Sequence, residues 1–399
     1  MSYPTPVSDR RDTAARRGSP GSGPGRFPGV RVLICPDKFA GTLPAPGVAA
    51  ALAEGWRAVA PDDDLVQRPL SDGGPGFVEV LARALPGRRV PVRTVDPLGR
   101  PVPGELLLVG ATAYVESAQA CGLHLLSAAE RDPNLTTSYG LGLLLAAAVE
   151  AGAAEVVVGL GGSAVNDGGA GMLAALGASP VDAAGYALPY GGAALTAAAG
   201  LAGAPQLRRV SLVAATDVDN PLTGLYGASS VYGPQKGASR ADVLRLDAAL
   251  EHFAAVLEQA FGTTGLAARP GAGAAGGVGA ALLALGGRTV SGIALVMNLI
   301  GLDAELDAAD LVVTGEGAFD HQSLRGKVCA GIAGGARDRG LPCVIVAGRV
   351  ETGHREAANA GVSELHSLVA HFGDERTALA EPDRGLREVG TRLARQWSR

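Results

Sequence analysis

Short apolar runs near the two ends of the chain predict strands that alternate with helices. The predicted strands are residues 30–34, 65–69, 310–313, 342–346 and 365–368. Residues 46–59 have a helical pattern with Pro46 in the first turn, and residues 327–337 form a second predicted helix. Strands that alternate with helices in this way are typical of a doubly wound α/β sheet.

The middle of the chain has a different pattern. Residues 89–117 alternate apolar and polar side chains on both sides of a Pro-Leu-Gly turn signal, which predicts a β-meander. An Ala- and Leu-rich helix is expected at residues 139–150, followed by strands at 155–158 and 210–214. This part of the chain therefore has its own set of strands and helices.

These patterns predict an α/β protein with a discontinuous Rossmann-like domain and an inserted second α/β domain. We assign residues 29–75 and 290–399 to the Rossmann-like domain and residues 76–289 to the inserted domain. A chain of 399 residues is too long for one ordinary core, which also favours two domains. Residues 1–28 are rich in Arg, Pro, Gly and Ser and lack the apolar run of a secretory signal, so we expect a disordered tail.

Composition narrows the expected partners and location. A formal net charge of -5 offers no basic face for a nucleic acid. No apolar run approaches the length of a membrane span, and the four cysteines are scattered without the spacing of a zinc site. We therefore expect a cytoplasmic protein with reduced cysteines that binds a small molecule and neither nucleic acid nor membrane; a homo-oligomer is compatible with the sequence.

Candidate chemistry lies in five loops that combine glycine with Asp or Glu. Glycine lets the backbone approach a ligand and turn its N–H groups towards phosphate, and neighbouring carboxylates can hold Mg²⁺ or orient a hydroxyl. The loops read PDKFAGTL (36–43), SDGGPG (71–76), GLGGSAVNDGGAGM (159–172), ATDVDNPLTGLYGASSVYGPQKGAS (215–239) and TGEGAFDHQSLRGK (314–327). Together they predict a site that is assembled from many loop ends.

Charged residues that follow predicted strands are the first candidates. Asp37 and Lys38 follow the first strand and Asp72 follows the second, at the edge of an α/β sheet where ligands bind. A capping role is the alternative for Asp37. Asp217 and Asp219 stand two residues apart after a strand, on one side of an extended segment, where paired oxygens suit Mg²⁺. A turn or cap role in the same loop is the alternative for this pair.

Two further glycine patterns favour other functions. Gly159-x-Gly161-x-x-Ala164 follows a strand and fits a dinucleotide fingerprint with Asp182 as the ribose contact, although no helix is predicted directly after it. The Gly-Lys pair that ends at Lys327 resembles the end of a P-loop but lacks its Ser or Thr, and an anion partner would explain a lysine at a helix start. The alternative functions are thus a nicotinamide-dependent dehydrogenase of a small hydroxy acid and a non-catalytic ligand-binding module.

The five loops resemble those of the bacterial glycerate kinases of the glyoxylate and glucarate pathways. The resemblance covers nearly the whole chain after the tail, and its most specific parts are GGSAVNDGGAG and DVDNPLTGLYGASSVYGPQKGA. It implies a Rossmann-like domain with a second domain inserted. It also implies transfer of the γ-phosphate of ATP to D-glycerate, with Mg²⁺ as the accompanying metal and 2-phosphoglycerate as the expected product.

The resemblance also implies roles for the candidate residues. Asp217 and Asp219 are expected to hold Mg²⁺ or to orient the substrate hydroxyl. Lys38 and Lys236 are expected to neutralise the transferring phosphate or the glycerate carboxylate. The catalytic candidates are Asp217, Lys38, Asp37 and Asp167. The nucleotide- or glycerate-binding candidates are Asp72, Gly161, Gly162, Ser163, Asn166, Lys236, Gly315, Glu316, Asp320 and Lys327. Ala40 occupies the position of a lysine that is common in the family's first loop, so Lys38 is expected to carry more of the charge there.

Overall fold

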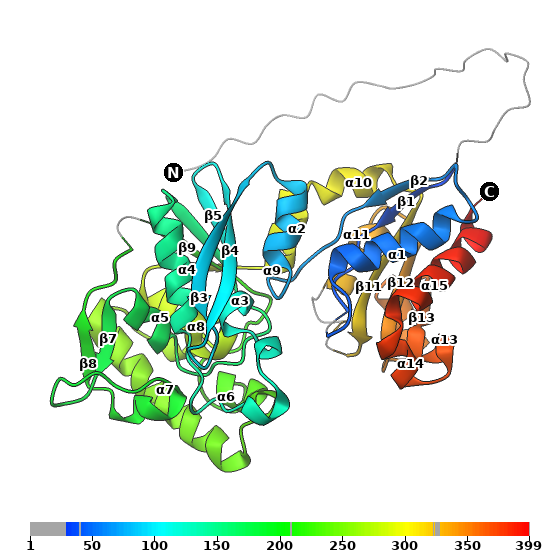
Figure 1. Ribbon diagram of the computed structural model, residues 1–399. Coiled ribbons are helices and arrows are strands. Elements are labelled where there is room, and N and C mark those ends of the chain that lie inside the picture. Colours follow the sequence, from blue (N-terminus) through cyan, green and yellow to red (C-terminus); the bar gives the residue numbers. More distant parts are fainter. Residues whose placement is uncertain (1–28, 40, 208–209, 322, 324–327, 399) are drawn as a thin grey trace, which may run out of the picture.

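The strands in the described part of the chain form two large sheets and one small sheet. The computed structural model describes residues 29–398 with the exception of 40, 208–209, 322 and 324–327, so the tail expected at residues 1–28 lies outside the described part. Figure 1 shows the two large sheets in separate lobes, one built from both ends of the chain and one from its middle. The α/β fold class is confirmed. None of the helices in the described segments is long and apolar enough to cross a lipid bilayer.

The first sheet contains five parallel strands in the order β13-β12-β11-β1-β2. Its strands are β1 (Arg31–Ile34), β2 (Asp64–Gln67), β11 (Leu311–Phe319), β12 (Cys343–Val350) and β13 (Glu364–Ser367). The helices beside it are α1 (Ala45–Arg57), α10 (Leu302–Ala308), α11 (Val328–Arg337), α12 (His354–Asn359), α13 (Leu368–Phe372), α14 (Glu375–Ala380) and α15 (Pro382–Trp397). Val32 and Ile34 pack with α1 and α15, whereas Leu33 packs with α10 and α11. Because helices cover both faces, the inner strands β1, β11 and β12 contain continuous apolar runs, whereas the edge strands β2 and β13 are more polar.

The second sheet contains six strands in the order β10-β9-β6-β5-β4-β3. They are β3 (Arg88–Val95), β4 (Pro101–Val109), β5 (Thr112–Glu116), β6 (Glu155–Gly159), β9 (Ser211–Ala215) and β10 (Arg288–Val290). The first three strands pair antiparallel, which confirms the predicted meander, and the others pair parallel. The short strands β7 (Ala178–Val181) and β8 (Gly200–Gly203) form the small sheet.

One face of the second sheet is covered by a helical layer, and the other faces the first lobe. The helices of this lobe are α3 (Ala118–Cys121), α4 (Tyr139–Glu150), α5 (Ala170–Ala175), α6 (Ala228–Tyr232), α7 (Arg240–Phe261) and α8 (Ala274–Ala284). Helices α2 (Phe77–Ala84) and α9 (Gly292–Leu299) lie between the lobes (Figure 1). A single apolar cluster contains Leu33 of the first sheet, Val157 of the second, and Phe77 and Ile293 of the two linking helices. The two lobes therefore share buried apolar surface.

The strand order of the first sheet determines where a ligand crevice opens. Counted along the chain, its strands run 2-1-3-4-5, so the connection reverses direction between β1 and β11. Ligands of doubly wound sheets bind outside the carboxyl ends of the strands at such a switch point. The backbone N–H of Asp37 donates to the carbonyl of Gly315 across this point, at 2.8 Å.

Strand β11 is longer than the sequence pattern predicts. We expected it to end at residue 313 and the TGEG segment to be a loop, but pairing with β12 continues through Phe319. Gly315 permits this because a side chain at that position would collide with the carbonyl of Val346 on the neighbouring strand. Gly315 and Glu316 are therefore held by a sheet ladder and not by a free loop.

Glycine-to-glycine contacts join the loop after β2 to the second sheet. The N–H of Gly161 donates to the carbonyl of Gly73 at 3.1 Å. A Cβ atom placed on Gly161 would lie 2.5 Å from the Cα atom of Gly74, and one on Gly159 would collide with the Gly73 carbonyl. The SDGG segment can lie across the end of β6 only because both sides lack side chains.

We predict that Gly161→Ala destabilises the protein, because its methyl group would meet the backbone of Gly74. The expected loss is about 1–3 kcal/mol in the free energy of unfolding, as for other overpacked sites. The matched control is Gly334→Ala in helix α11, where a methyl group meets nothing within 4 Å. That change should leave stability equal or raise it by roughly 0.5–1 kcal/mol. Denaturant unfolding measures both; equal stability of Gly161→Ala and the parent protein would contradict the close approach.

Candidate active site

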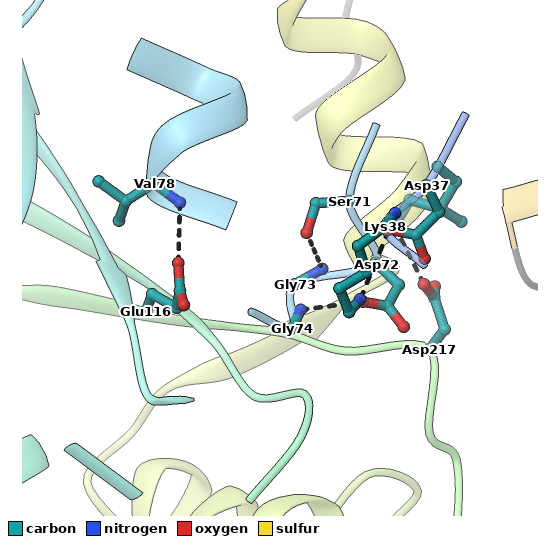
Figure 2. Close-up of polar contacts among 10 residues, drawn as sticks. Asp37, Lys38, Ser71, Asp72, Gly73, Gly74, Val78, Glu116 and Asp217 are labelled. Atoms are coloured by element: carbon teal, nitrogen blue, oxygen red, sulfur yellow. Dashed lines mark hydrogen bonds and ion pairs between the residues drawn. The ribbon is translucent and has the colours of Figure 1, made fainter. Parts of the chain in front are cut away.

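Lys38 lies between two carboxylates at the switch point of the first sheet. Its Nζ atom is 3.4 Å from Oδ1 of Asp37 and 3.3 Å from Oδ1 of Asp72. Figure 2 shows the ammonium group between the two acids, with Asp72 also accepting from the N–H of Gly74 at 2.9 Å. The side chain of Lys38 is 18% exposed and that of Asp37 is 12% exposed, so water screens their ion pair only a little, whereas the Asp72 side chain is 33% exposed. The structure thus brings together three residues that the sequence placed after two separate strands.

The charges in this cluster shift the pKa values of its members in different directions. Burial raises the pKa of Asp37 to about 7, helped by the negative charges of Asp72 and Glu316 and opposed by Lys38. Burial also acts to raise the pKa of Asp72, but the Lys38 ammonium and the Gly74 N–H outweigh it and hold that pKa below its usual value. Burial opposes the charge of Lys38, yet Asp72 and Asp37 together raise its pKa. The site therefore contains one charged pair and one carboxyl that titrates near neutrality.

Asp217 approaches the same cluster from the second sheet. It follows β9, and its carboxylate accepts hydrogen bonds from the Ser291 hydroxyl at 2.6 Å and from the Ile293 N–H at 3.1 Å, at the start of helix α9. Figure 2 shows its carboxylate directed towards Lys38 and Asp72. Partial burial raises its pKa despite these hydrogen bonds, and the charge of Asp72 adds to the shift. Asp217 therefore both caps a helix and adds negative charge to the site.

Asp219, the expected companion of Asp217, lines an open pocket with it. Thr289 and Ser291 also line that pocket. Among the described residues, no group of three or more His, Cys, Asp or Glu side chains is arranged to hold a metal ion. The Asp217 and Asp219 side chains share a surface, but they do not form a protein-built metal cage.

A second cluster surrounds Lys236 in the other lobe. This lysine is 2% exposed, and its Nζ donates to the carbonyl of Val165 at 2.6 Å and to the Ser163 hydroxyl at 3.3 Å. Burial lowers its pKa to about 8, while the Asp167 carboxylate opposes the shift. Asn166 is fully buried; its Nδ2 donates to Ser229 at 2.9 Å, and its Oδ1 has no hydrogen-bond partner in the described part of the chain.

Asp167, expected as a catalytic candidate, makes several hydrogen bonds within its own lobe, and its catalytic role stays a prediction. Its carboxylate accepts from the N–H and the hydroxyl of Ser138 at 2.7 and 2.8 Å, and from the N–H groups of Gly169 and Gly171 at 3.1 Å each. The residue is fully buried, and burial raises its pKa. These hydrogen bonds hold the starts of α4 and α5 against the loop after β6. The Asp167 side chain is not exposed to solvent.

The remaining predicted residues divide between the first sheet and segments that are not described. Glu316 lies on β11, close enough to Asp37 to raise its pKa. Asp320 forms a turn with Ser323, in which each backbone N–H donates to the other side chain at 3.0 Å. Lys327 and Ala40 lie outside the described residues.

The dinucleotide fingerprint is not realised in the structure. Gly161 and Gly162 pack against Gly74 and Pro75, and the next helix, α5, begins only after seven further residues, at Ala170. Asp182, the expected ribose contact, instead closes a turn, where it accepts from the N–H groups of Ala184 and Tyr186. The glycine loop instead packs against the SDGG segment, where the two lobes meet.

Two polar residues at the joint were missed by the sequence analysis. Glu116 ends strand β5, is 5% exposed, and accepts from the N–H of Val78 at 3.2 Å, so it caps helix α2 beside the SDGG segment. Ser291 caps α9 and holds Asp217. An acid at a strand end and a serine before an apolar helix were the available signals, but their partners are far away in the sequence.

Comparison with known proteins agrees with the arrangement of these loops. A family model described as the glycerate kinase family matches residues 32–398. The glycerate 2-kinase of Escherichia coli K12 is 40% identical over 377 residues, which cover 92% of this chain and 98% of the relative. The chain belongs to the glycerate kinase family. It is therefore an enzyme, a kinase.

Other relatives extend this result to the whole fold. A glycerate kinase from Halalkalibacterium halodurans is 38% identical, covering 91% of this chain and 97% of the relative. A crystal structure described as glycerate kinase 2 from Salmonella typhimurium LT2 is 37% identical, with a TM-score of 0.74 over 92% of this chain and 98% of that one. The kinase fold is thus shared along nearly the full length.

We predict that Lys38→Met impairs the kinase, because Asp37 and Asp72 lose their shared cation. The expected effect is about a tenfold loss in kcat/KM, or about 1.4 kcal/mol, with partial recovery in Lys38→Arg, which keeps the charge but not its compact shape. The control is Arg83→Met, which breaks the exposed ion pair with Glu79 on α2. Steady-state kinetics decide the matter: if Lys38→Met and Arg83→Met both match the parent enzyme, the ion pairs of Lys38 are dispensable.

Proposed function

We propose that the protein transfers the γ-phosphate of ATP to D-glycerate and forms 2-phosphoglycerate. The observation that carries the proposal is the cluster of Asp37, Lys38 and Asp72 at the switch point, with Asp217 facing it from the second lobe. Phosphoryl transfer depends chiefly on positioning and on neutralising charge, and the cluster supplies a cation and several carboxylates for both purposes. The name of the Escherichia coli relative supports the 2-hydroxyl as the acceptor.

In this proposal Asp37 is the general base. A carboxyl whose pKa is about 7 is deprotonated in a large fraction of molecules at neutral pH and still has affinity for a proton. The Asp37 carboxylate takes the proton of the glycerate 2-hydroxyl as that oxygen forms its bond to the γ-phosphorus. The bond from the γ-phosphorus to the bridging oxygen breaks, and ADP leaves with that oxygen. Lys38 stabilises the negative charge on the phosphoryl oxygens.

The carboxylates on both sides of this cluster fit a magnesium ion. Mg²⁺ is usually held by one or two carboxylates together with substrate phosphates and water, so a kinase needs no three-acid cage. We assign Asp217 and Asp72 as its ligands, because the charge of Asp72 already raises the pKa of Asp217 and a cation would relieve that repulsion. Asp219, which we expected as the second ligand, lines the same pocket as Asp217. The ion would neutralise the charge of the phosphates.

We propose that the cluster around Lys236 binds the carboxylate of glycerate. Lys236 with a pKa of about 8 is mainly charged at neutral pH, and it contacts Ser163, which is 7% exposed. Gly161 lies against Gly74, so the loop that carries Ser163 begins at the joint beside Asp72. A small hydroxy acid bound there would have its hydroxyl between the lobes.

A coupled assay for ADP tests the function directly. With Mg²⁺, ATP and D-glycerate together, we expect ADP release at a rate that falls to background when any one of the three is left out. Enolase should consume the product without a phosphoglycerate mutase if the phosphate is on the 2-hydroxyl. Oxidation of NADH with hydroxypyruvate, in the absence of ADP formation, would instead establish the dehydrogenase.

The pKa of Asp37 predicts how the rate depends on pH. Because the carboxylate form increases as the pH rises through about 7, kcat/KM should rise over the same interval. Asp37→Asn should abolish this rising limb and lower kcat by about a hundredfold or more.

The same raised pKa predicts how the stability of the protein depends on pH. Because the pKa of Asp37 is higher in the folded than in the unfolded protein, the folded protein loses stability as the pH rises towards 7. Above pH 7 the charged Asp37 carboxylate destabilises the fold. The variant should therefore keep its melting temperature at pH 8; a normal pH profile in Asp37→Asn would exclude Asp37 as the base.

A further inference from the structure

A pocket beside the first sheet has no role in the site described so far. It lies at the carboxyl ends of β11 and β12, next to the switch point. Its lining includes Phe39, Thr42, Gly317, Ala318, Val369 and Leu379. The helical residues among them come from α13 and α14, which none of the glycine-rich loops contains.

The pocket has apolar walls and a polar edge. This combination suits a flat, largely apolar ring that carries polar groups at one end. Phe39 and Ala378 are 3% and 5% exposed and form an apolar floor, while Leu379 is 56% exposed at the rim. Gly348 comes so close to the carbonyl of Gly317 on the neighbouring strand that a side chain would collide with it, and no side chain rises from either glycine. Pockets for cofactors typically combine such apolar walls with a few polar groups.

The polar edge consists of one cation and one acid. Arg349 lies on β12, 3.1 Å from Glu351 and 3.6 Å from Glu375. Arg349 and Glu375 both line the pocket, and about half of each side chain is exposed. A carboxylate in this position can accept hydrogen bonds from ribose hydroxyls, as an acidic residue does in dinucleotide-binding folds.

One residue of the pocket lies next to the charged cluster. Phe39 directly follows Lys38, and its ring lies 3.6 Å from the Cβ position of Gly315, whose carbonyl binds the N–H of Asp37. A molecule with a ring in the pocket and a chain of phosphates would place those phosphates towards Lys38. Glycerate has neither the size nor the apolar surface to fill this space.

We propose that this pocket binds the base and ribose of the nucleoside triphosphate. The inference rests on the proposed function, in which ATP is the phosphate donor. Phe39, Val369, Ala378 and Leu379 contact the base, and Glu375 receives the ribose hydroxyls. Residues of α13 and α14 near the end of the chain thereby determine the affinity for the nucleoside, while Lys38 receives the phosphates.

Calorimetric titration of the full chain with ADP and with inorganic tripolyphosphate, both in the presence of Mg²⁺, tests the proposal. Ala378→Phe fills the pocket, and Leu379→Ala removes its exposed wall without touching the core. We expect Ala378→Phe to weaken ADP binding about tenfold or more and Leu379→Ala to weaken it severalfold, with the affinity for tripolyphosphate unchanged. Leu244→Ala, on the exposed surface of α7 in the other lobe, is the matched control and should bind ADP as the parent does.

The outcomes separate the pocket from the wider proposal. If the parent enzyme forms ADP from ATP but both pocket variants bind ADP with parental affinity, the base binds elsewhere and the inference is wrong. If the pocket variants lose ADP and tripolyphosphate equally, the pocket acts on the phosphates or on the fold, and the inference is also wrong. If the parent enzyme forms no ADP with any hydroxy acid, the proposed function itself fails. The melting temperature of Leu379→Ala is measured to check that this variant is folded, so the test does not depend on Ala378→Phe.

Discussion

The shared ion pair of Lys38 is the interaction on which the site depends. The Lys38 ammonium forms ion pairs with both Asp37 and Asp72. Glu316 on β11 and Asp217 from the second lobe add further negative charge. Four carboxylates around one lysine leave an excess of negative charge in a partly buried site. Burial raises the pKa values of Asp37 and Asp217, and the charge of Asp72 adds to both shifts. Such a site repels bare phosphates. In the proposed function, a nucleotide that arrives with its magnesium ion would bring the positive charge that the protein lacks.

Close backbone contacts put this charge cluster in a defined place. The SDGG segment leaves β2, crosses the ends of β6 and β9, and enters α2, and a side chain on Gly159 or Gly161 would push it away. Glu116 and Asp217 then cap α2 and α9, the two helices between the lobes. Buried apolar residues of both sheets form one cluster around those helices. The lobes are thus joined by packing and caps directly behind the site.

The two lobes divide the proposed work between them. The edge of the parallel sheet carries the charge cluster and the apolar pocket beside Phe39, a pairing that suits a nucleoside triphosphate. The second lobe carries the buried Lys236 with Ser163 and Asn166, which suits a small carboxylate. Asp217 connects the two parts, because it extends from the second sheet and its carboxylate faces Asp72.

Local pattern alone was sufficient to place the five strands of the parallel sheet, the meander, and Asp37, Lys38 and Asp72 after two of those strands. Apolar periodicity depends on neighbouring residues, and residues that end parallel strands share one edge by topology. Tertiary structure decided what those rules do not contain: the extension of β11 through Glu316, the sequestration of Asp167, and the capping of α9 by Asp217. It also decided that α14 closes a pocket beside residue 39. Each of these depends on partners tens to hundreds of residues away, and a hydrogen bond or a collision between such partners leaves no periodic signal in the sequence.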